Sequence, residues 1–205
     1  MHIYPAILTE DKKELEKMLN LAETFCKNVH LDIMDGLFVP TKSISYNDLP
    51  KTSLFTEIHL MVNVPLDYVD GFKQKGAGRI IFHFEGKDNP KEVIKKIKKE
   101  GMEVGISLNP ETAISNLFPF FDEIDLVLIM SVIPGFYGSK FIPEVLNKAE
   151  KLKKEKPSLM LEMDGGIKTS NISLVKEVGI DIAAVGSEIF LSENPALAYE
   201  RLTKI

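Results

Sequence analysis

The sequence predicts an α/β fold, a single (β/α)8 TIM barrel that spans residues 1–205. Short apolar runs alternate with charged, amphipathic stretches from one end of the chain to the other, and the runs number eight. Most of these runs are too continuous for the half-exposed strands of an antiparallel sheet. Strands that alternate with helices form a parallel sheet, and eight parallel strands are the number that closes a TIM barrel.

The apolar runs are rich in Ile, Val, Leu and Phe, and each is short enough to be one strand. We expect strands near residues 3–8, 28–34, 56–62, 79–84, 102–108, 124–131, 158–163 and 181–185. A doubly wound open sheet is the alternative fold. It is disfavoured because Pro5-Ala6-Ile7-Leu8-Thr9-Glu10 stands where a G-x-G-x-x-G motif would follow the first strand.

The stretches between the strands have the spacing of amphipathic helices. Residues 11–25 repeat apolar side chains at intervals of three and four, at Leu15, Met18, Leu19, Ala22 and Phe25. Residues 90–100 begin with Pro90, turn Val93, Ile94 and Ile97 inward, and stop at Gly101. Residues 143–156, 168–178 and 194–203 follow the same pattern, whereas residues 35–55 are irregular, with only a short helix near Asn47–Ser53. No linker divides the chain.

The composition argues against nucleic-acid binding and membrane association and is compatible with a small anionic substrate. The net charge of −5 and the pI near 5.5 give no basic face for nucleic acid. A small anionic substrate is compatible with this charge, because a few backbone N–H groups can hold a phosphate. A single cysteine, Cys26, and the lack of a leader-like or membrane-spanning apolar run predict a soluble cytoplasmic protein with no membrane association.

Polar side chains interrupt three of the predicted strands. His30 and Asp32 stand two apart and project to one face, His59 follows Glu57-Ile58, and Asp164 ends the seventh strand. In one barrel these four side chains can converge and bind Zn²⁺, Fe²⁺, Mn²⁺ or Co²⁺. Taken singly, each has a structural alternative, a hydrogen-bonded core histidine or a helix cap. His83 is not assigned to the metal, because Glu85 can hold it in place.

Glycines mark a predicted phosphate site. Gly165-Gly166 follows the seventh strand and Gly186-Ser187 the eighth, where TIM barrels commonly bind phosphate through backbone N–H groups. Tight turns are the alternative. Residues 131–141, which include Pro134-Gly135-Phe136-Tyr137-Gly138, are similar to a lid that excludes water, or form an ordinary ordered loop.

The sequence resembles the ribulose-phosphate 3-epimerase family over nearly its whole length. The resemblance is carried by the residues Pro5-Ala6-Ile7-Leu8, His30-Leu31-Asp32-Ile33-Met34-Asp35-Gly36, Phe38-Val39-Pro40, His59-Leu60-Met61-Val62, Met130-Ser131-Val132, Pro134-Gly135-Phe136, Met163-Asp164-Gly165-Gly166 and Val185-Gly186-Ser187-Glu188-Ile189-Phe190. It implies a TIM barrel in which His30, Asp32, His59 and Asp164 bind one divalent metal ion, with zinc the first expectation.

The resemblance also implies the chemistry, which is epimerisation at carbon 3 of ribulose 5-phosphate to give xylulose 5-phosphate. Asp32 and Asp164 would exchange the proton as base and acid. Substrate would contact His59, Met34, Met61 and Met130, the loop residues Gly135, Phe136, Tyr137 and Gly138, and the phosphate-binding residues Gly165, Gly166, Gly186 and Ser187. Asp35, which lies off the parity of Asp32, would be structural. Barrels of this family often associate, so a homo-oligomer is a further expectation.

Several residues depart from the family pattern. Ala6 stands where serine is usual, Leu37 and Thr41 where histidine and asparagine are usual, and Tyr137 and Ser139 where glycine and glutamine are usual. A hexulose phosphate such as allulose 6-phosphate is therefore an alternative substrate. A decarboxylase or synthase on the same barrel is disfavoured, because Asp32-Ile33-Met34-Asp35 lacks the lysine of an Asp-x-Lys-x-x-Asp motif. A silent sugar-phosphate sensor would not need both aspartates.

Overall fold

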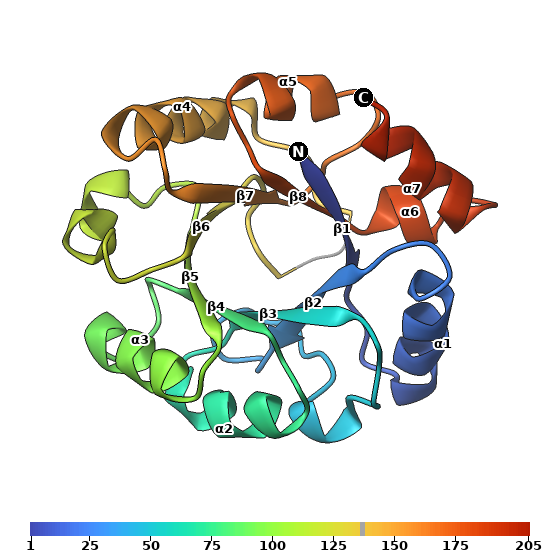
Figure 1. The fold of residues 1–205 in the computed structure, drawn as a ribbon, viewed down its shortest axis with the longest axis horizontal. Helices are drawn as coiled ribbons and strands as arrows, with labels where there is room; N and C mark the ends of the chain where they lie inside the picture. Colours follow the sequence, from blue (N-terminus) through green and yellow to red (C-terminus); the bar gives the residue numbers. More distant parts are fainter. Residues whose placement is uncertain (136–137) are drawn as a thin grey trace.

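The computed structural model describes residues 1–135 and 138–205, and its parallel strands close a barrel in sequence order from β1 to β8 (Figure 1). The strands are β1 His2–Ile7, β2 Asn28–Met34, β3 Phe55–Met61, β4 Arg79–His83, β5 Glu103–Leu108, β6 Leu126–Met130, β7 Met160–Asp164 and β8 Ile182–Val185. The predicted TIM barrel is confirmed, and each predicted strand begins and ends within two residues of the observed one.

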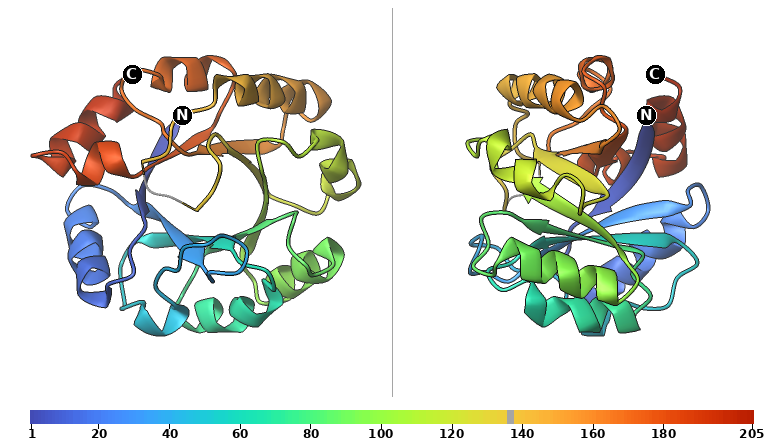
Figure 2. Two further views of the ribbon diagram at one scale, coloured as in Figure 1. Left: turned by 180° about the vertical axis from the view of Figure 1, so that it is seen from behind. Right: turned by 60° about the vertical axis from the view of Figure 1, so that its left-hand side comes forward.

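Helices surround the barrel on all sides, as the views from front, back and side show (Figures 1 and 2). The α-helices are α1 Lys12–Ala22, α2 Leu66–Gln74, α3 Pro90–Lys99, α4 Leu146–Glu155, α5 Ile172–Glu177, α6 Ser187–Phe190 and α7 Pro195–Thr203, and the 3-10 turns are η1 Tyr46–Asp48, η2 Ile114–Phe120 and η3 Pro143–Val145. No helix within residues 1–135 and 138–205 has both the length and the apolar character needed to cross a bilayer.

The first helices follow directly from their sequences. Asp11 caps α1 by accepting hydrogen bonds from the backbone N–H groups of Lys13 and Glu14. The apolar face of α1 then buries Leu15 and Leu19 against the outside of the barrel. In α3 the three predicted residues, Val93, Ile94 and Ile97, are buried, and Gly101 takes the left-handed conformation, with φ of 72°, just beyond the helix end.

Three helices differ from the prediction, among them the four-residue helix α6 Ser187–Phe190, which was not predicted. The helix expected over 168–178 begins only at Ile172, because the Asn171 side chain holds a turn by accepting from Lys168 N–H at 2.7 Å. Helix α2 was missed, since Gly71 lowers the helix propensity of its sequence. That glycine is required by packing: a Cβ there would lie 2.6 Å from the ring of Tyr46.

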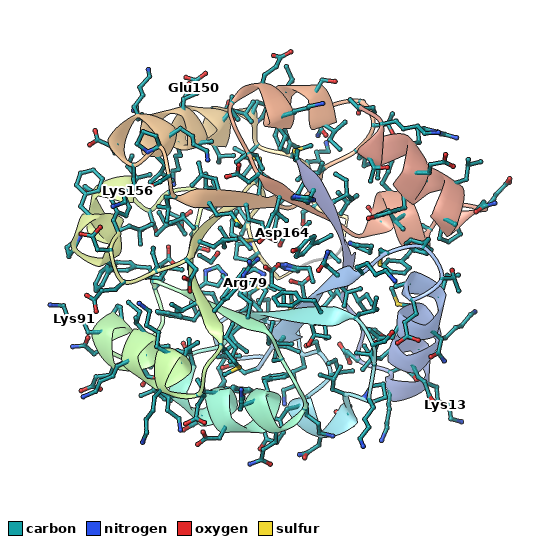
Figure 3. All side chains as sticks on the ribbon, in the orientation of Figure 1. Lys13, Arg79, Lys91, Glu150, Lys156 and Asp164 are labelled. Carbon is teal, nitrogen blue, oxygen red and sulfur yellow. The ribbon has the colours of Figure 1, made fainter. Side chains whose placement is uncertain are left out.

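The inside of the barrel carries both apolar and ionisable side chains, and β4 supplies both kinds, since Ile81 lies between Arg79 and His83. Tyr4, Ile81, Leu126, Leu128 and Ile182 form a buried apolar cluster across the strands β1, β4, β6 and β8. Other inward positions of the strands hold ionisable side chains, and Figure 3 shows Arg79 and Asp164 within the ring of strands while Lys13 and Lys91 point outward. Charged groups inside a barrel lose their hydration, so each needs a partner or a ligand.

Candidate active site

Four side chains from strands β2, β3 and β7 meet inside one end of the barrel. His30 Nε2 lies 3.3 Å from Asp32 Oδ1 and 3.2 Å from His59 Nδ1. His59 Nδ1 also lies 3.1 Å from Asp32 Oδ1 and 3.6 Å from Asp164 Oδ2. One ligand atom from each of the four residues lies within 4.8 Å of the other three. The structure therefore brings together all four residues predicted to bind metal.

Strand register explains the meeting. Asp32 pairs with His59 across β2 and β3, so their side chains leave the sheet side by side. His30 pairs with Glu57 and lies one layer deeper, fully buried, with its Nε2 directed up toward the cluster. Asp164 arrives from β7 at the same end of the barrel, because parallel strands all end at one face.

The geometry of the four donor atoms fits a divalent cation. Tetrahedral zinc with bonds of about 2.0–2.1 Å separates its ligand atoms by about 3.3 Å, which is close to the 3.1, 3.2 and 3.3 Å measured between the two histidines and Asp32. Two imidazoles and two carboxylates are donors that suit zinc and neighbouring transition metals. Four acceptor atoms this close repel one another unless protons or a cation lie between them.

His30 is held from below by two buried carboxyl groups. Its Nδ1 lies 2.7 Å from Glu57 Oε1 and 3.1 Å from Glu162 Oε1. Because a carboxylate accepts and does not donate, Nδ1 carries the hydrogen, which leaves Nε2 free for a metal. His30, Glu57 and Glu162 also lie within 4.8 Å of one another, but Arg79 already neutralises Glu57 at 2.5 Å, so we assign no second cation there.

Glu57, Glu162 and Arg79 were not among the predicted site residues. The spacing along the strands could have identified the two glutamates. Glu57 lies two residues before His59, and Glu162 two before Asp164, so each points to the same face of its strand, the barrel interior. Charged residues at inward positions of apolar strands are costly unless paired, and that cost could have identified the three as one network.

The surroundings shift the two aspartates in opposite directions. Burial works against ionisation of Asp32, but hydrogen bonds from His30 and His59 outweigh it and hold the pKa of Asp32 well below its usual range. Burial, reinforced by the charge of Asp32, raises the pKa of Asp164 to about 6. Although burial alone would lower the pKa of His30, its hydrogen bonds to Asp32, Glu162 and Glu57 raise it well above 6.5. One proton-holding and one ionised carboxyl side by side is the arrangement expected of an acid and a base.

These shifts predict the pH dependence of metal binding. Groups whose pKa is raised hold protons at low pH, so a cation must displace protons from His30 and from Asp164, whose pKa is about 6. We expect Co²⁺ affinity to rise with pH between about 5 and 7, by about tenfold per pH unit for each proton released. Calorimetry in buffers of different ionisation enthalpy measures the released protons, and a pH-independent affinity with no proton release would contradict the expectation.

A pocket opens above the four ligands and contains nearly all the predicted substrate-binding residues that the structure describes. Met34, Met61 and Met130 form its apolar wall with Leu8 and Val132, and Asp32 and Asp164 lie on its floor. Gly135, Gly138, Gly165, Gly166, Gly186 and Ser187 line the rest. His59 lies beneath this wall and is fully buried. Phe136 and Tyr137 fall outside the described residues.

The glycines after β7 are required by close packing. Gly166 has φ of 62°, and a Cβ there would lie 2.7 Å from Phe141 N and 2.8 Å from Ser139 O. Asn171 donates to Gly166 O at 3.0 Å and fixes the turn. The turn after β7 therefore packs on the backbone of Ser139 and Phe141 more closely than any side chain at Gly166 would permit.

Serines fix the strand ends that carry the aspartates. Ser131 Oγ donates to Asp164 O at 2.9 Å, and Ser43 Oγ donates to Asp32 O at 2.9 Å. Asp35 points away from the ligands and accepts backbone N–H groups of Leu37, Phe38 and Asn63 at 2.8 Å, as expected of a structural residue. Leu37 is 76% exposed, outside the pocket wall.

Comparison with known proteins places this site in a family. The model of the ribulose-phosphate 3 epimerase family matches residues 2–190. The chain belongs to the ribulose-phosphate 3-epimerase family. It is 38% identical to the protein named ribulose-phosphate 3-epimerase, cytoplasmic isoform, of Oryza sativa subsp. japonica, over 98% of this chain and 92% of that one. It is 34% identical to ribulose-phosphate 3-epimerase of Bacillus subtilis (strain 168), over 92% and 91%.

Solved structures with low sequence identity share the (β/α)8 barrel fold. KGPDC from Streptococcus mutans in complex with D-R5P aligns with a TM-score of 0.73 at 13% identity, over 98% of this chain and 95% of that one. The 3-hexulose-6-phosphate synthase from Salmonella typhimurium aligns with a TM-score of 0.71 at 16% identity, over 100% and 97%. At these identities the likeness concerns the fold alone.

Proposed function

We propose that this chain is a ribulose-phosphate 3-epimerase, an isomerase that interconverts D-ribulose 5-phosphate and D-xylulose 5-phosphate. The observation that carries the proposal is the pair Asp32 and Asp164, which reach one pocket from β2 and β7 beside two imidazole nitrogens. Membership in the family and the shared name of relatives from plants and bacteria support the same reaction.

The two aspartates perform the proton transfers in this proposal. One carboxylate removes the proton from carbon 3, next to the carbonyl at carbon 2, and the other returns a proton to the opposite face. The opposite shifts of their pKa values prepare one as base and the other as acid. Their roles exchange when the reaction runs in the reverse direction.

A divalent cation held by His30, Asp32, His59 and Asp164 would supply a Lewis acid for the negative charge that develops on the sugar oxygens. Zinc is the first choice, since its bond lengths match the separations of the donor atoms, and Fe²⁺, Mn²⁺ and Co²⁺ suit the same ligands. The apolar wall of Met34, Met61 and Met130 excludes water from this end of the pocket.

Phosphate would rest on the backbone of Gly165, Gly166, Gly186 and Ser187, with Gly135, Phe136, Tyr137 and Gly138 as the covering loop and His59 reaching the substrate from below.

The proposal treats residues 1–205 as one catalytic domain. It also includes a cytoplasmic location, supported by the single cysteine and by a relative named as a cytoplasmic isoform. Association into a homo-oligomer is the remaining expectation and is tested by sedimentation.

A hexulose phosphate is the second candidate substrate. The observation that favours it is Ala6, which lines the pocket where the family usually has a serine hydroxyl. Losing one hydrogen bond to substrate costs about 0.5–1.5 kcal/mol, which changes affinity more than chemistry.

Deuterium incorporation tests the proposed function. The protein, loaded with Zn²⁺ or Co²⁺, is incubated in D2O with ribulose 5-phosphate or with allulose 6-phosphate. We expect deuterium at carbon 3 and conversion to the epimer, faster with ribulose 5-phosphate. Faster turnover of the hexulose phosphate would reassign the substrate, and exchange with neither compound would leave a sugar-phosphate-binding protein.

A further inference from the structure

His83 contacts His59 edge to edge but is not assigned to the metal, and the function proposed above gives it no role. The Nε2 atoms of the two rings lie 3.0 Å apart, and the ring centroids are 5.0 Å apart, with the two ring planes inclined by 20°. Phe38 packs on His83 at 4.7 Å, and His83 is 1% exposed. A buried histidine in this position must have its hydrogen-bonding groups satisfied by protein.

The acceptor for the other nitrogen of His83 is Glu85. His83 Nδ1 lies 3.3 Å from Glu85 Oε2. The second carboxylate oxygen, Glu85 Oε1, accepts the Asn109 backbone N–H at 2.9 Å and the hydroxyl of Thr112. Lys148 Nζ fixes the same loop by donating to Asn109 O and Thr112 O. Both carboxylate oxygens of Glu85 therefore accept hydrogen bonds: Oε1 from the Asn109 N–H and the Thr112 hydroxyl, and Oε2 from His83 Nδ1.

These contacts favour one placement of the hydrogens on the two rings when a cation takes the place of the hydrogen between His59 Nδ1 and Asp32. An ionised Glu85 only accepts, so His83 Nδ1 carries a hydrogen and Nε2 of the neutral ring is bare. Two N–H groups do not face each other at hydrogen-bonding distance, and a bare Nε2 on His83 requires a hydrogen on Nε2 of His59. In that tautomer Nδ1 of His59, which faces Asp32 and Asp164, is open to a cation. Without a cation, the contact with Asp32 at 3.1 Å favours the other tautomer, with the hydrogen on Nδ1.

We propose that His83 and Glu85 are positioning residues of the metal centre: through two hydrogen bonds in series they hold His59 in the tautomer whose Nδ1 is free to bind a cation. The inference rests on the metal site of the proposed function. In this proposal the pair His83 and Glu85 supports His59 as Glu57 supports His30. Each histidine then directs its free nitrogen toward the same cation site.

Glu85→Gln tests the proposal with little change in shape. The Asn109 N–H fixes the amide oxygen in place of Oε1, so the amide NH2 faces His83 Nδ1. A donor at that position reverses both hydrogen bonds and puts the hydrogen of His59 on Nδ1, where the cation would bind. We expect Co²⁺ affinity, measured by its absorption spectrum on titration of the metal-free protein, to fall about 10- to 100-fold. Glu111→Gln, which removes the same charge from an exposed position of the following loop, is the control and should bind Co²⁺ as wild type does.

Nitrogen-15 spectra of the imidazole rings give a second readout on the wild-type protein, so the test does not depend on the variant folding. With Zn²⁺ bound, we expect His83 to carry its hydrogen on Nδ1 and His59 on Nε2. A hydrogen on Nε2 of His83, or a Glu85→Gln variant that binds Co²⁺ as tightly as wild type, would overturn the positioning role and leave the metal site standing. Failure of the wild-type protein to bind Co²⁺ or Zn²⁺ would instead overturn the metal site itself.

Discussion

Asp32→Asn and Asp164→Asn are each expected to lower the rate of epimerisation by about 10²- to 10⁴-fold, because each removes one of the two carboxyl groups that transfer the proton in the proposed reaction. Asparagine keeps the shape and one oxygen donor, so a cation can still be bound by the remaining ligands. The two variants should also differ from each other. Each retains a carboxylate on one side of carbon 3, so residual deuterium exchange is expected on one epimer with Asp32→Asn and on the other with Asp164→Asn.

The measurement is exchange at carbon 3 in D2O from each epimer, with Co²⁺ content determined alongside. Asp67→Asn removes an exposed carboxylate far from the pocket and serves as the control with wild-type activity. Epimerisation above a tenth of the wild-type rate in either variant would exclude that aspartate as a proton carrier.

Arg79→Met is expected to lower the free energy of unfolding by about 3–5 kcal/mol, since removing one partner of a buried ion pair leaves an uncompensated charge. Arg79 is 4% exposed and lies 2.5 Å from Glu57, which is fully buried. Its guanidinium also reaches Glu103 at 2.8 Å. Methionine has a similar volume but no charge, so the loss is electrostatic rather than steric.

Urea unfolding of the metal-free protein measures the effect. The double variant Arg79→Met/Glu57→Gln should recover most of the loss, because a glutamine oxygen still accepts from His30 Nδ1 and no charge is left unpaired. Lys91→Met on the exposed face of α3 should stay within about 0.5 kcal/mol of wild type. A single Arg79 variant as stable as wild type would show that water reaches Glu57.

The barrel and the convergence of His30, Asp32, His59 and Asp164 could be predicted because they depend on local pattern and parity. Continuous apolar runs located all eight strands, and the two-residue spacing of His30 and Asp32 placed both side chains inside. Helix α2 was missed because Gly71, a poor helix former, is explained only by the Tyr46 ring packed against it. That contact joins distant parts of the chain and leaves no trace in local periodicity.

The support of the ligands was the other part that could not be predicted. Glu57, Arg79 and Glu162 come from three strands, and their pairing depends on the register of the closed sheet. The same holds for His83, whose neighbour Glu85 was expected to hold it, while its contact with His59 depends on how β3 and β4 align. Strand parity shows that a side chain points inward, and register decides which side chain it meets.

Asp164 is far from the other three ligands in the chain, and this separation links cation binding to the folding of the whole protein. The other three ligands lie on β2 and β3, and the fourth is absent until β7 has docked. A bound ion would act as a crosslink between the first and last thirds of the polypeptide. In the folded barrel these parts already lie together, so the ion binds without the entropic cost of closing a long loop. Partly synthesised chains would therefore hold metal weakly, and loading would be coupled to completion of the fold.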